Sequence, residues 1–291
     1  MEERDTSRTA LGTAYLRAAH QLFDAPPRIL EDPVAVPLLG AEAVRRLHER
    51  KQSLQAPGRL GLRSHVVLRS RFAEDRLEAA ARRGASQYVI LGAGFDTFAY
   101  RRRDVSDGGR VRVFEVDHPR TQAEKLRRVA QAGWPAPRGL VHVAVDFATE
   151  DLATSLRHAG LEPGLRTFFS WMGVTYYLER AAMEATFRAL AALGAPGSTV
   201  VFDHLDDAAF DPERQTPRMR TTLELVARVG EPMKTGLAPA AMAACLRACG
   251  WEARAQLGRD ELQARYFDRR GDGYRARDHF HVVSATSSSP S

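Results

Sequence analysis

The chain has 291 residues, of which 44% are hydrophobic and 27% charged, the composition of an ordinary globular protein. No apolar run approaches the roughly 18 residues of a membrane span, and no apolar segment follows the charged N-terminus, so neither a membrane anchor nor a signal peptide is expected. Two cysteines cannot frame a disulfide-rich fold or a four-ligand zinc site, and they indicate a cytoplasmic location. The net charge of +6 comes from scattered arginines without interleaved aromatic residues, so no nucleic-acid partner is expected.

From residue 61 onward, apolar runs of strand length alternate with helical patterns. The first sixty residues instead indicate helices broken by prolines, and hydrophobic residues three or four apart predict a helix over Val66–Ala80. Strands are expected at Gln87–Leu91, Val111–Val116, Leu140–Val145, Thr167–Trp171, Ser198–His204, Trp251–Leu257 and His279–Ala285. Further helices are expected at Arg120–Gln131, Glu150–His158, Glu179–Leu193 and Ala238–Cys249. The alternation predicts an α/β fold in which a parallel sheet of seven strands has helices on both faces.

Two segments lie outside this alternation. We expect residues 1–60 to form an N-terminal helical cap segment, residues 61–285 the main domain, and residues 286–291 a disordered tail. Within the main domain, residues 205–237 form an insertion after the fifth strand. Because ligands of open α/β sheets bind beyond the carboxyl ends of the strands, the cap segment and the insertion are candidate lids over an acceptor site. Peripheral packing is the alternative.

A glycine-rich turn, Gly92-Ala93-Gly94, follows the first expected strand. Glycine allows the backbone to turn sharply and to approach a ligand without a Cβ in the way. In a dinucleotide-binding fingerprint a third glycine would stand where this chain has Thr97, and that glycine lets the next helix hold a pyrophosphate. Its absence disfavours NAD and FAD and favours a nucleoside ligand without phosphate, such as S-adenosylmethionine.

The next two strands end in acidic residues. Asp117 comes about 25 residues after Gly92, close to the usual offset of a carboxylate that binds ribose hydroxyls. Asp146 and Phe147 follow the third strand, where the carboxylate could accept a hydrogen bond from the adenine amine and the ring could pack beside the base. The turn and the two acids together predict a nucleoside-binding site.

The segments ARRGASQYVILGAGFDTFAYR, VFEVDHP and HVAVDF resemble the leucine carboxyl methyltransferase family of class I S-adenosylmethionine-dependent methyltransferases. Within that family the chain is most similar to the bacterial branch that includes polyketide carboxyl O-methyltransferases. The resemblance implies a Rossmann-like class I methyltransferase sheet and S-adenosylmethionine as the cofactor. No metal site is expected, and nothing in the sequence indicates an oligomeric state.

The resemblance also implies which residues bind the cofactor. Arg71 would grip the methionine carboxylate with its planar fork of donors. The Gly92–Gly94 turn would pass beneath the methionine and the ribose, and Asp117 would hold the ribose hydroxyls. Asp146 and Phe147 would frame the adenine.

One position departs from the family pattern. Where family members often carry a glutamate after the fourth strand, this chain has Met172. A backbone carbonyl of Ser170 or Trp171 would then bind the methionine amine, and the sulfonium end of the cofactor would lie against Met172 and Tyr176. No catalytic residue is assigned. Tyr176, His118 and His204 are candidates, against structural roles for each of them.

We expect methyl transfer from S-adenosylmethionine to an oxygen of a small molecule, foremost a carboxylate, in secondary metabolism. A carboxylate is ionised at pH 7 and needs no general base, so catalysis reduces to alignment in a closed pocket. The N-terminal region, Arg218 or Arg220 could supply a cation for it. Two alternatives remain open: methylation of a hydroxyl or phenol with His118 or His204 as base, and a non-catalytic S-adenosylmethionine-binding protein.

Overall fold

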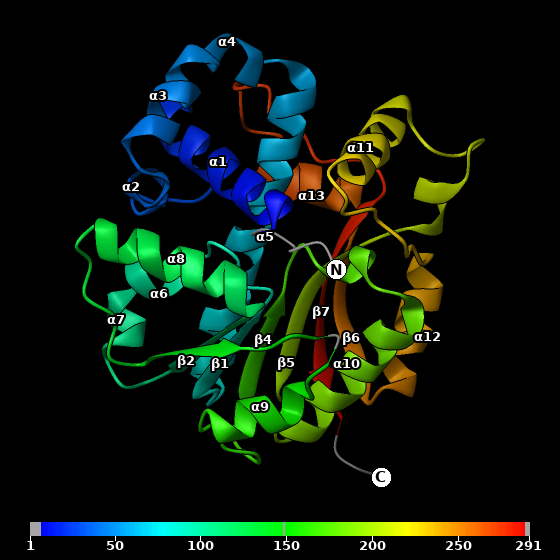
Figure 1. The fold of residues 1–291 in the computed structure, drawn as a ribbon. Coiled ribbons are helices and arrows are strands. Elements are labelled where there is room, and N and C mark those ends of the chain that lie inside the picture. The colour runs from blue at the N-terminus through cyan, green and yellow to red at the C-terminus, as the bar shows by residue number, and fades with distance from the viewer. Residues whose placement is uncertain (1–6, 148, 289–291) are drawn as a thin grey trace.

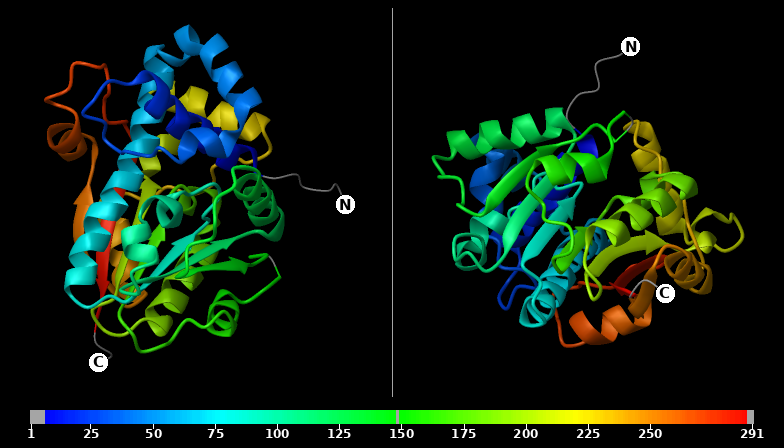
Figure 2. Two further views of the ribbon diagram at one scale, coloured as in Figure 1. Left: turned by 90° about the vertical axis from the view of Figure 1, so that its left-hand side faces the viewer. Right: turned by 90° about the horizontal axis from the view of Figure 1, so that it is seen from below.

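The computed structural model describes residues 7–147 and 149–288, and its centre is a seven-stranded sheet with helices on both faces (Figures 1 and 2). Each expected strand is present, with bounds that differ by at most two residues. The strands are β1 Gln87–Leu91, β2 Arg112–Asp117, β3 Leu140–Ala144, β4 Thr167–Trp171, β5 Thr199–Leu205, β6 Trp251–Leu257 and β7 Phe280–Ser287. They lie in the order β3-β2-β1-β4-β5-β7-β6.

The expectation of an all-parallel sheet is wrong for one strand, because β7 pairs antiparallel with both β5 and β6. The other described pairs of strands are parallel. The cause lies in the segment before β7, which ends where β5 ends: the Asp206 amide donates to the carbonyl of His279 at 2.9 Å. The chain therefore enters β7 at the carboxyl edge of β5 and has to run back.

Alternating residues of each central strand feed two separate cores, one on each face of the sheet. In β1, Val89 and Leu91 pack on one face, whereas Tyr88 and Ile90 pack on the other. The first face is covered by α9 (Leu152–His158), α10 (Arg180–Leu193) and α12 (Pro239–Ala248), and the second by α5 (Pro57–Arg82) and α13 (Arg259–Tyr266). Burial on both faces explains why these strands are almost continuously apolar.

The expected helices are present, and several short ones were not anticipated. The long α8 is Pro119–Gln131, whereas α6 Phe98–Arg101, α7 Arg103–Ser106 and the 3-10 turn η1 Thr175–Tyr177 have only three or four residues. Elements this short carry no hydrophobic period. The unanticipated α13 buries a single residue, Leu262, so its sequence has no apolar stripe either.

The N-terminal region forms helices over the carboxyl ends of the strands (Figure 1). These are α1 Arg8–Phe23, α2 Ala35–Leu39, α3 Ala41–Glu49 and α4 Lys51–Leu54, and they share a hydrophobic cluster with Phe95, Tyr100 and Val129 of the main domain. Helix α5 then runs from this group down along the sheet (Figure 2). The expected boundary at residue 60 therefore falls inside one continuous helix.

The insertion at 205–237 contains the 3-10 turn η2 Asp207–Phe210 and the helix α11 Pro217–Arg228. The expected tail begins too early, because Thr286 and Ser287 pair in β7 and Ser287 is buried; residues 289–291 lie outside the described residues. Cys245 and Cys249 are free and buried in the core against α10, where they pack as small hydrophobic residues. Among the described residues no helix is long and apolar enough to cross a membrane.

Candidate active site

A cavity of about 1780 Å³ opens beyond the carboxyl ends of the central strands, between the sheet, α1, α5 and α11. Its floor includes the Gly92–Gly94 turn and Asp117, and its roof includes residues of the N-terminal helices and of the insertion. The sheet edge, the cap segment and the insertion thus enclose one space.

The glycine turn has a backbone that other residues would not tolerate. Gly92 has φ 63° and Gly94 has φ 52°, and a Cβ on Gly92 would stand 2.5 Å from Cγ2 of Val174. Ala93 continues the sheet by donating its amide to the carbonyl of Val116 at 3.0 Å. All three turn residues line the cavity, so the bare backbone is available to a ligand.

Asp117 stands at the end of β2 beside this turn. Its carboxylate accepts hydrogen bonds from the Gly94 amide and, at 2.7 Å, from the His118 amide, and burial raises the pKa of the carboxyl group. His118 caps α8 by accepting from the Arg120 amide at 3.3 Å, and it also lines the cavity. Asp117 therefore fixes the turn and presents a desolvated carboxylate to the same space.

The two residues expected around an adenine are separated. Phe147 lines the cavity with 48% of its surface exposed, which leaves a ring face free for a ligand. Asp146 does not line the cavity, and its backbone amide donates to Glu150 at 2.7 Å. Of this pair, only Phe147 is brought to the site.

Arg71 lies on the outer side of α5, where its side chain is 49% exposed and pairs with Asp75 at 2.8 Å. Two residues earlier, Arg69 faces the cavity and is 12% exposed, with Nη1 3.2 Å from the Tyr176 hydroxyl. Residues two apart on a helix point about 200° apart, so only one of them can face inward. Of these two arginines, only Arg69 lines the cavity.

A buried pair, His65 and Asp203, was missed at the level of sequence. Nε2 of His65 lies 3.0 Å from Asp203, whose carboxylate also lies 3.6 Å from Arg69 and accepts from the Gly173 amide. His65 lines the cavity, and burial lowers its pKa, so the ring is neutral near pH 7. The available signals were an acid inside the apolar strand TVVFDHL and a histidine one helical turn before Arg69.

The remaining candidates divide between the cavity and the core. Ser170 and Met172 line the cavity, and the Ser170 hydroxyl is 3.0 Å from that of Tyr88. Tyr176 also lines it, with burial raising its pKa well above the ordinary value. His204 does not line it, because its ring bonds to the carbonyl of Leu205 at 2.9 Å within the sheet. The expectation of His204 as a base is therefore wrong.

Thr97, which replaces the third glycine, ties the turn to the N-terminal region. Its hydroxyl donates to Asp32 at 2.8 Å and accepts from Arg17 at 2.6 Å, and all three side chains are buried. A glycine here would leave two buried charged groups short of a partner. The departure from the dinucleotide pattern thus fastens α1 next to the glycine turn.

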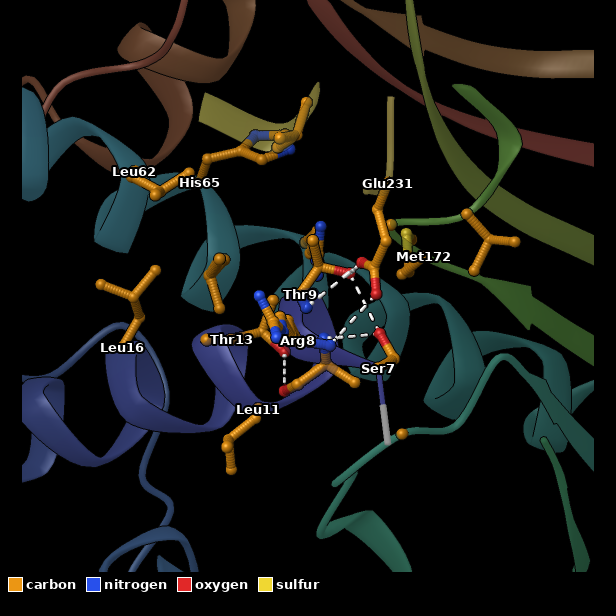
Figure 3. Close-up of a pocket in the computed structure, with 18 of the residues that line it drawn as sticks. Ser7, Arg8, Thr9, Leu11, Thr13, Leu16, Leu62, His65, Met172 and Glu231 are labelled. Carbon is orange, nitrogen blue, oxygen red and sulfur yellow. Dashed lines mark hydrogen bonds between the residues drawn. The ribbon is translucent and has the colours of Figure 1, made fainter. Parts of the chain in front are cut away.

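The insertion and the N-terminal helix meet over the cavity at Glu231 (Figure 3). The Glu231 carboxylate accepts from the amides of Arg8, at 3.1 Å, and Thr9, at 3.2 Å, and from the Thr9 hydroxyl. These amides open α1 and have no partner within the helix. Residues more than 220 positions apart therefore form a clasp across the roof, which we call the Glu231 clasp.

Comparison with known proteins shows the family to which the chain belongs. Residues 10–191 match the model of the leucine carboxyl methyltransferase family. The chain belongs to this family. A Bacillus subtilis relative, YktD, is 29% identical over 98% of the chain and 99% of its own length, and a Mycobacterium avium relative is 32% identical over 76% and 74%. Both are described as candidate S-adenosyl-L-methionine-dependent methyltransferases.

Solved structures show the same fold at low sequence identity. A DUF574 family protein from Streptomyces avermitilis superposes with a TM-score of 0.60 at 14% identity, covering 95% of this chain and 97% of the other. A Thermobifida fusca protein described as a candidate methyltransferase gives the same score and identity, with coverages of 95% and 94%. The leucine carboxyl methyltransferase family member described here is accordingly an S-adenosylmethionine-dependent methyltransferase with a class I sheet.

Proposed function

We propose that the chain methylates a carboxylate oxygen of a small molecule to give a methyl ester, with secondary metabolism as the context. When bound, S-adenosylmethionine supplies a methyl group activated on a sulfonium. The residues fit this cofactor: the Gly92–Gly94 turn presents bare backbone to the cavity, Asp117 would hold the ribose hydroxyls, and Phe147 would pack on the adenine. Arg69 would bind the methionine carboxylate.

The observation that carries the proposal is that cofactor residues and unpaired cations line one continuous cavity. The glycine turn and Asp117 lie at one end, whereas Arg218 and Arg277, from the insertion and from the segment before β7, line another part. Neither arginine forms an ion pair among residues 7–147 and 149–288. An anionic acceptor would therefore find complementary charge in the same space as the cofactor.

Esterification of a carboxylate asks little of the protein beyond placement. The acceptor oxygen is already ionised at pH 7, so these residues have to align it with the methyl group and to keep water out. The Glu231 clasp and the N-terminal helices cover the cavity, which serves the second need. Tyr176 accepts a hydrogen bond from Arg69 at its hydroxyl and packs edge-on against the ring of Phe280.

The proposal is tested by supplying the protein with S-adenosylmethionine labelled in the methyl group and a panel of carboxylic acids and phenols. Mild alkali releases methanol from a methyl ester but not from a methyl ether, so volatile label after alkali identifies carboxylate methylation. Label that stays on the product after alkali would overturn the carboxylate assignment. Binding of S-adenosylhomocysteine without label transfer to any acceptor would favour the non-catalytic alternative.

A second candidate function, methylation of a hydroxyl or phenol, is favoured by His65. With Nε2 donating to Asp203, the ring keeps Nδ1 as a base, and the cavity is adjacent. His65→Gln separates the two functions: it should abolish methylation of a hydroxyl and spare that of a carboxylate. Equal activity of the variant on every acceptor would remove His65 from the chemistry.

A further inference from the structure

Arg277 is a buried cation that the cofactor roles leave unused. It lies in the segment between α13 and β7, is 5% exposed, and lines the cavity. Its guanidinium packs over the ring of Phe280, 4.9 Å from the centroid, and donates to the Thr222 hydroxyl at 2.7 Å. The Thr222 hydroxyl donates a hydrogen bond to the carbonyl of Arg218 at 2.9 Å, so its oxygen is free to accept from Arg277.

The acidic side chains near Arg277 are engaged elsewhere. Its neighbour Asp278 pairs with Arg259 at 3.2 Å, and Asp203 is taken by His65 and Arg69. In the described part of the chain no carboxylate lies within ion-pair distance of Arg277. A buried charge without a partner is costly, and ordinary cores avoid it.

A second cation makes the local imbalance larger. Arg218 projects from α11 to the same cavity, with Nη1 3.6 Å from where a Cβ on Gly61 would stand, and it has no ion pair among the described residues either. Burial, together with the positive charge of Arg218, lowers the pKa of Arg277 to about 10. The two guanidinium groups repel each other unless an anion lies between them.

The surroundings of these cations are apolar. The Phe280 ring contacts Arg277 and also the rings of His65, at 4.2 Å, and Tyr176, at 5.9 Å. On α11, Leu225 follows Arg218 by seven residues and so shares its face; it lines the cavity with 48% of its surface exposed. A ligand here meets charge at one end and hydrocarbon at the other.

We propose that Arg277, with Thr222 and Arg218, binds the anionic group of the methyl acceptor while an apolar part of that acceptor lies against Leu225. This proposal rests on the proposed function and narrows it, because it selects amphipathic anions over neutral or purely polar acceptors. Arg277 supplies a desolvated charge, Thr222 orients it, and Arg218 adds attraction from the exposed side. The acceptor neutralises the charge that the protein leaves unpaired.

The test uses a matched pair of fluorescent probes in the presence of saturating S-adenosylhomocysteine. 8-Anilinonaphthalene-1-sulfonate is an amphipathic anion, and N-phenyl-1-naphthylamine has the same ring system without the sulfonate. We expect the sulfonate to bind one site per chain and Arg277→Gln to weaken it at least tenfold, with little change for the neutral amine. Octanoate should displace the sulfonate, whereas octanamide should not.

Controls separate charge recognition from folding and from catalysis. Arg275→Gln removes a charge two residues away on an exposed side chain and should leave the affinity unchanged, whereas Arg277→Lys keeps the cation if the glutamine variant does not fold. Equal affinity for both probes, or unchanged sulfonate binding in Arg277→Gln, would overturn the proposal. Sulfonate binding that depends on Arg277, without methyl transfer to any carboxylate, would leave the site standing and refute only the function.

Discussion

Gly173 lies flat against the guanidinium of Arg69: a Cβ at this glycine would stand 2.6 Å from both Nη1 and Nη2. The glycine has φ 78°, and its amide donates to Asp203, which also faces Arg69. The loop after β4 and the helix α5 thus hold this arginine from two sides. These contacts fix the direction in which the Arg69 side chain points into the cavity.

Arg69→Gln should weaken binding of S-adenosylhomocysteine roughly tenfold or more, because a charge-assisted contact to the ligand carboxylate is lost. Arg71→Gln is the matched control on the same helix, since its side chain is exposed and pairs with Asp75. Calorimetric titration of both variants measures the difference. If Arg71→Gln weakened binding and Arg69→Gln did not, the assignment of the arginine would be reversed.

Asp117→Ala should weaken S-adenosylmethionine binding by about 1–3 kcal/mol, through loss of the acceptor for the ribose hydroxyls. The same change removes the acceptor for the Gly94 amide, so Asp117→Asn, which keeps one oxygen, is the gentler variant. Titration calorimetry gives the dissociation constants. An unchanged constant in both variants would refute the ribose assignment.

Glu231→Ala should loosen the start of α1, because the amides of Arg8 and Thr9 lose their acceptor. A lost cap costs about 1 kcal/mol, so amide hydrogen exchange there should quicken about fivefold. Glu224→Ala, an exposed acid on α11, is the control. Exchange at residues 7–12 that stays at the wild-type rate would show that the Glu231 clasp does not hold the roof.

His204 should make the protein lose stability in mild acid. Burial lowers its pKa to about 4, so between that value and the ordinary 6.5 only the unfolded chain takes up the proton. The free energy of unfolding therefore falls as the pH drops through this interval, by up to about 3 kcal/mol. Urea unfolding at pH 7 and pH 4.5 should show a smaller loss in His204→Gln than in wild type.

Replacement of an exposed histidine, His158→Gln, provides the reference for this experiment. It should leave the acid-induced loss as large as in the wild type. An equal loss in wild type and His204→Gln would mean that the acid sensitivity has another source, such as the buried pair His65 and Asp203.

The sheet could be predicted from the sequence because strands buried on both faces carry continuous apolar runs. The bounds expected for Gln87–Leu91 and Thr167–Trp171 match the observed ones for this reason. The direction of β7 could not be predicted, because it depends on where the preceding segment lies in space. That segment reaches the end of β5, where His279 pairs with Asp206. Short helices such as α6 could not be predicted either, because four residues are too few to show a helical hydrophobic period.

At the site, the sequence could predict those residues whose position follows from the end of a strand. The Gly92–Gly94 turn and Asp117 sit where strand ends place them, and the cavity includes both. Side chains that meet through tertiary contacts were beyond the sequence. Arg69 and Arg71 are equivalent in the sequence, and only the orientation of α5 decides which of them faces the cavity. Arg277 stands out only because the folded chain buries it without an acidic partner among the described residues.

Helix α11 buries only one of its own residues, Met219, yet it brings Arg218, Thr222 and Leu225 to the cavity. Substitutions of Arg218, Thr222 or Leu225, none of which is buried, should therefore change the free energy of unfolding little, whereas Met219 packs in a hydrophobic cluster with Leu205 and Phe280. The cofactor end rests on other elements, namely β1, β2, β4 and α5. With the proposed acceptor site, substitutions at these three positions should therefore change the acceptor preference while methyl-donor binding stays as it is.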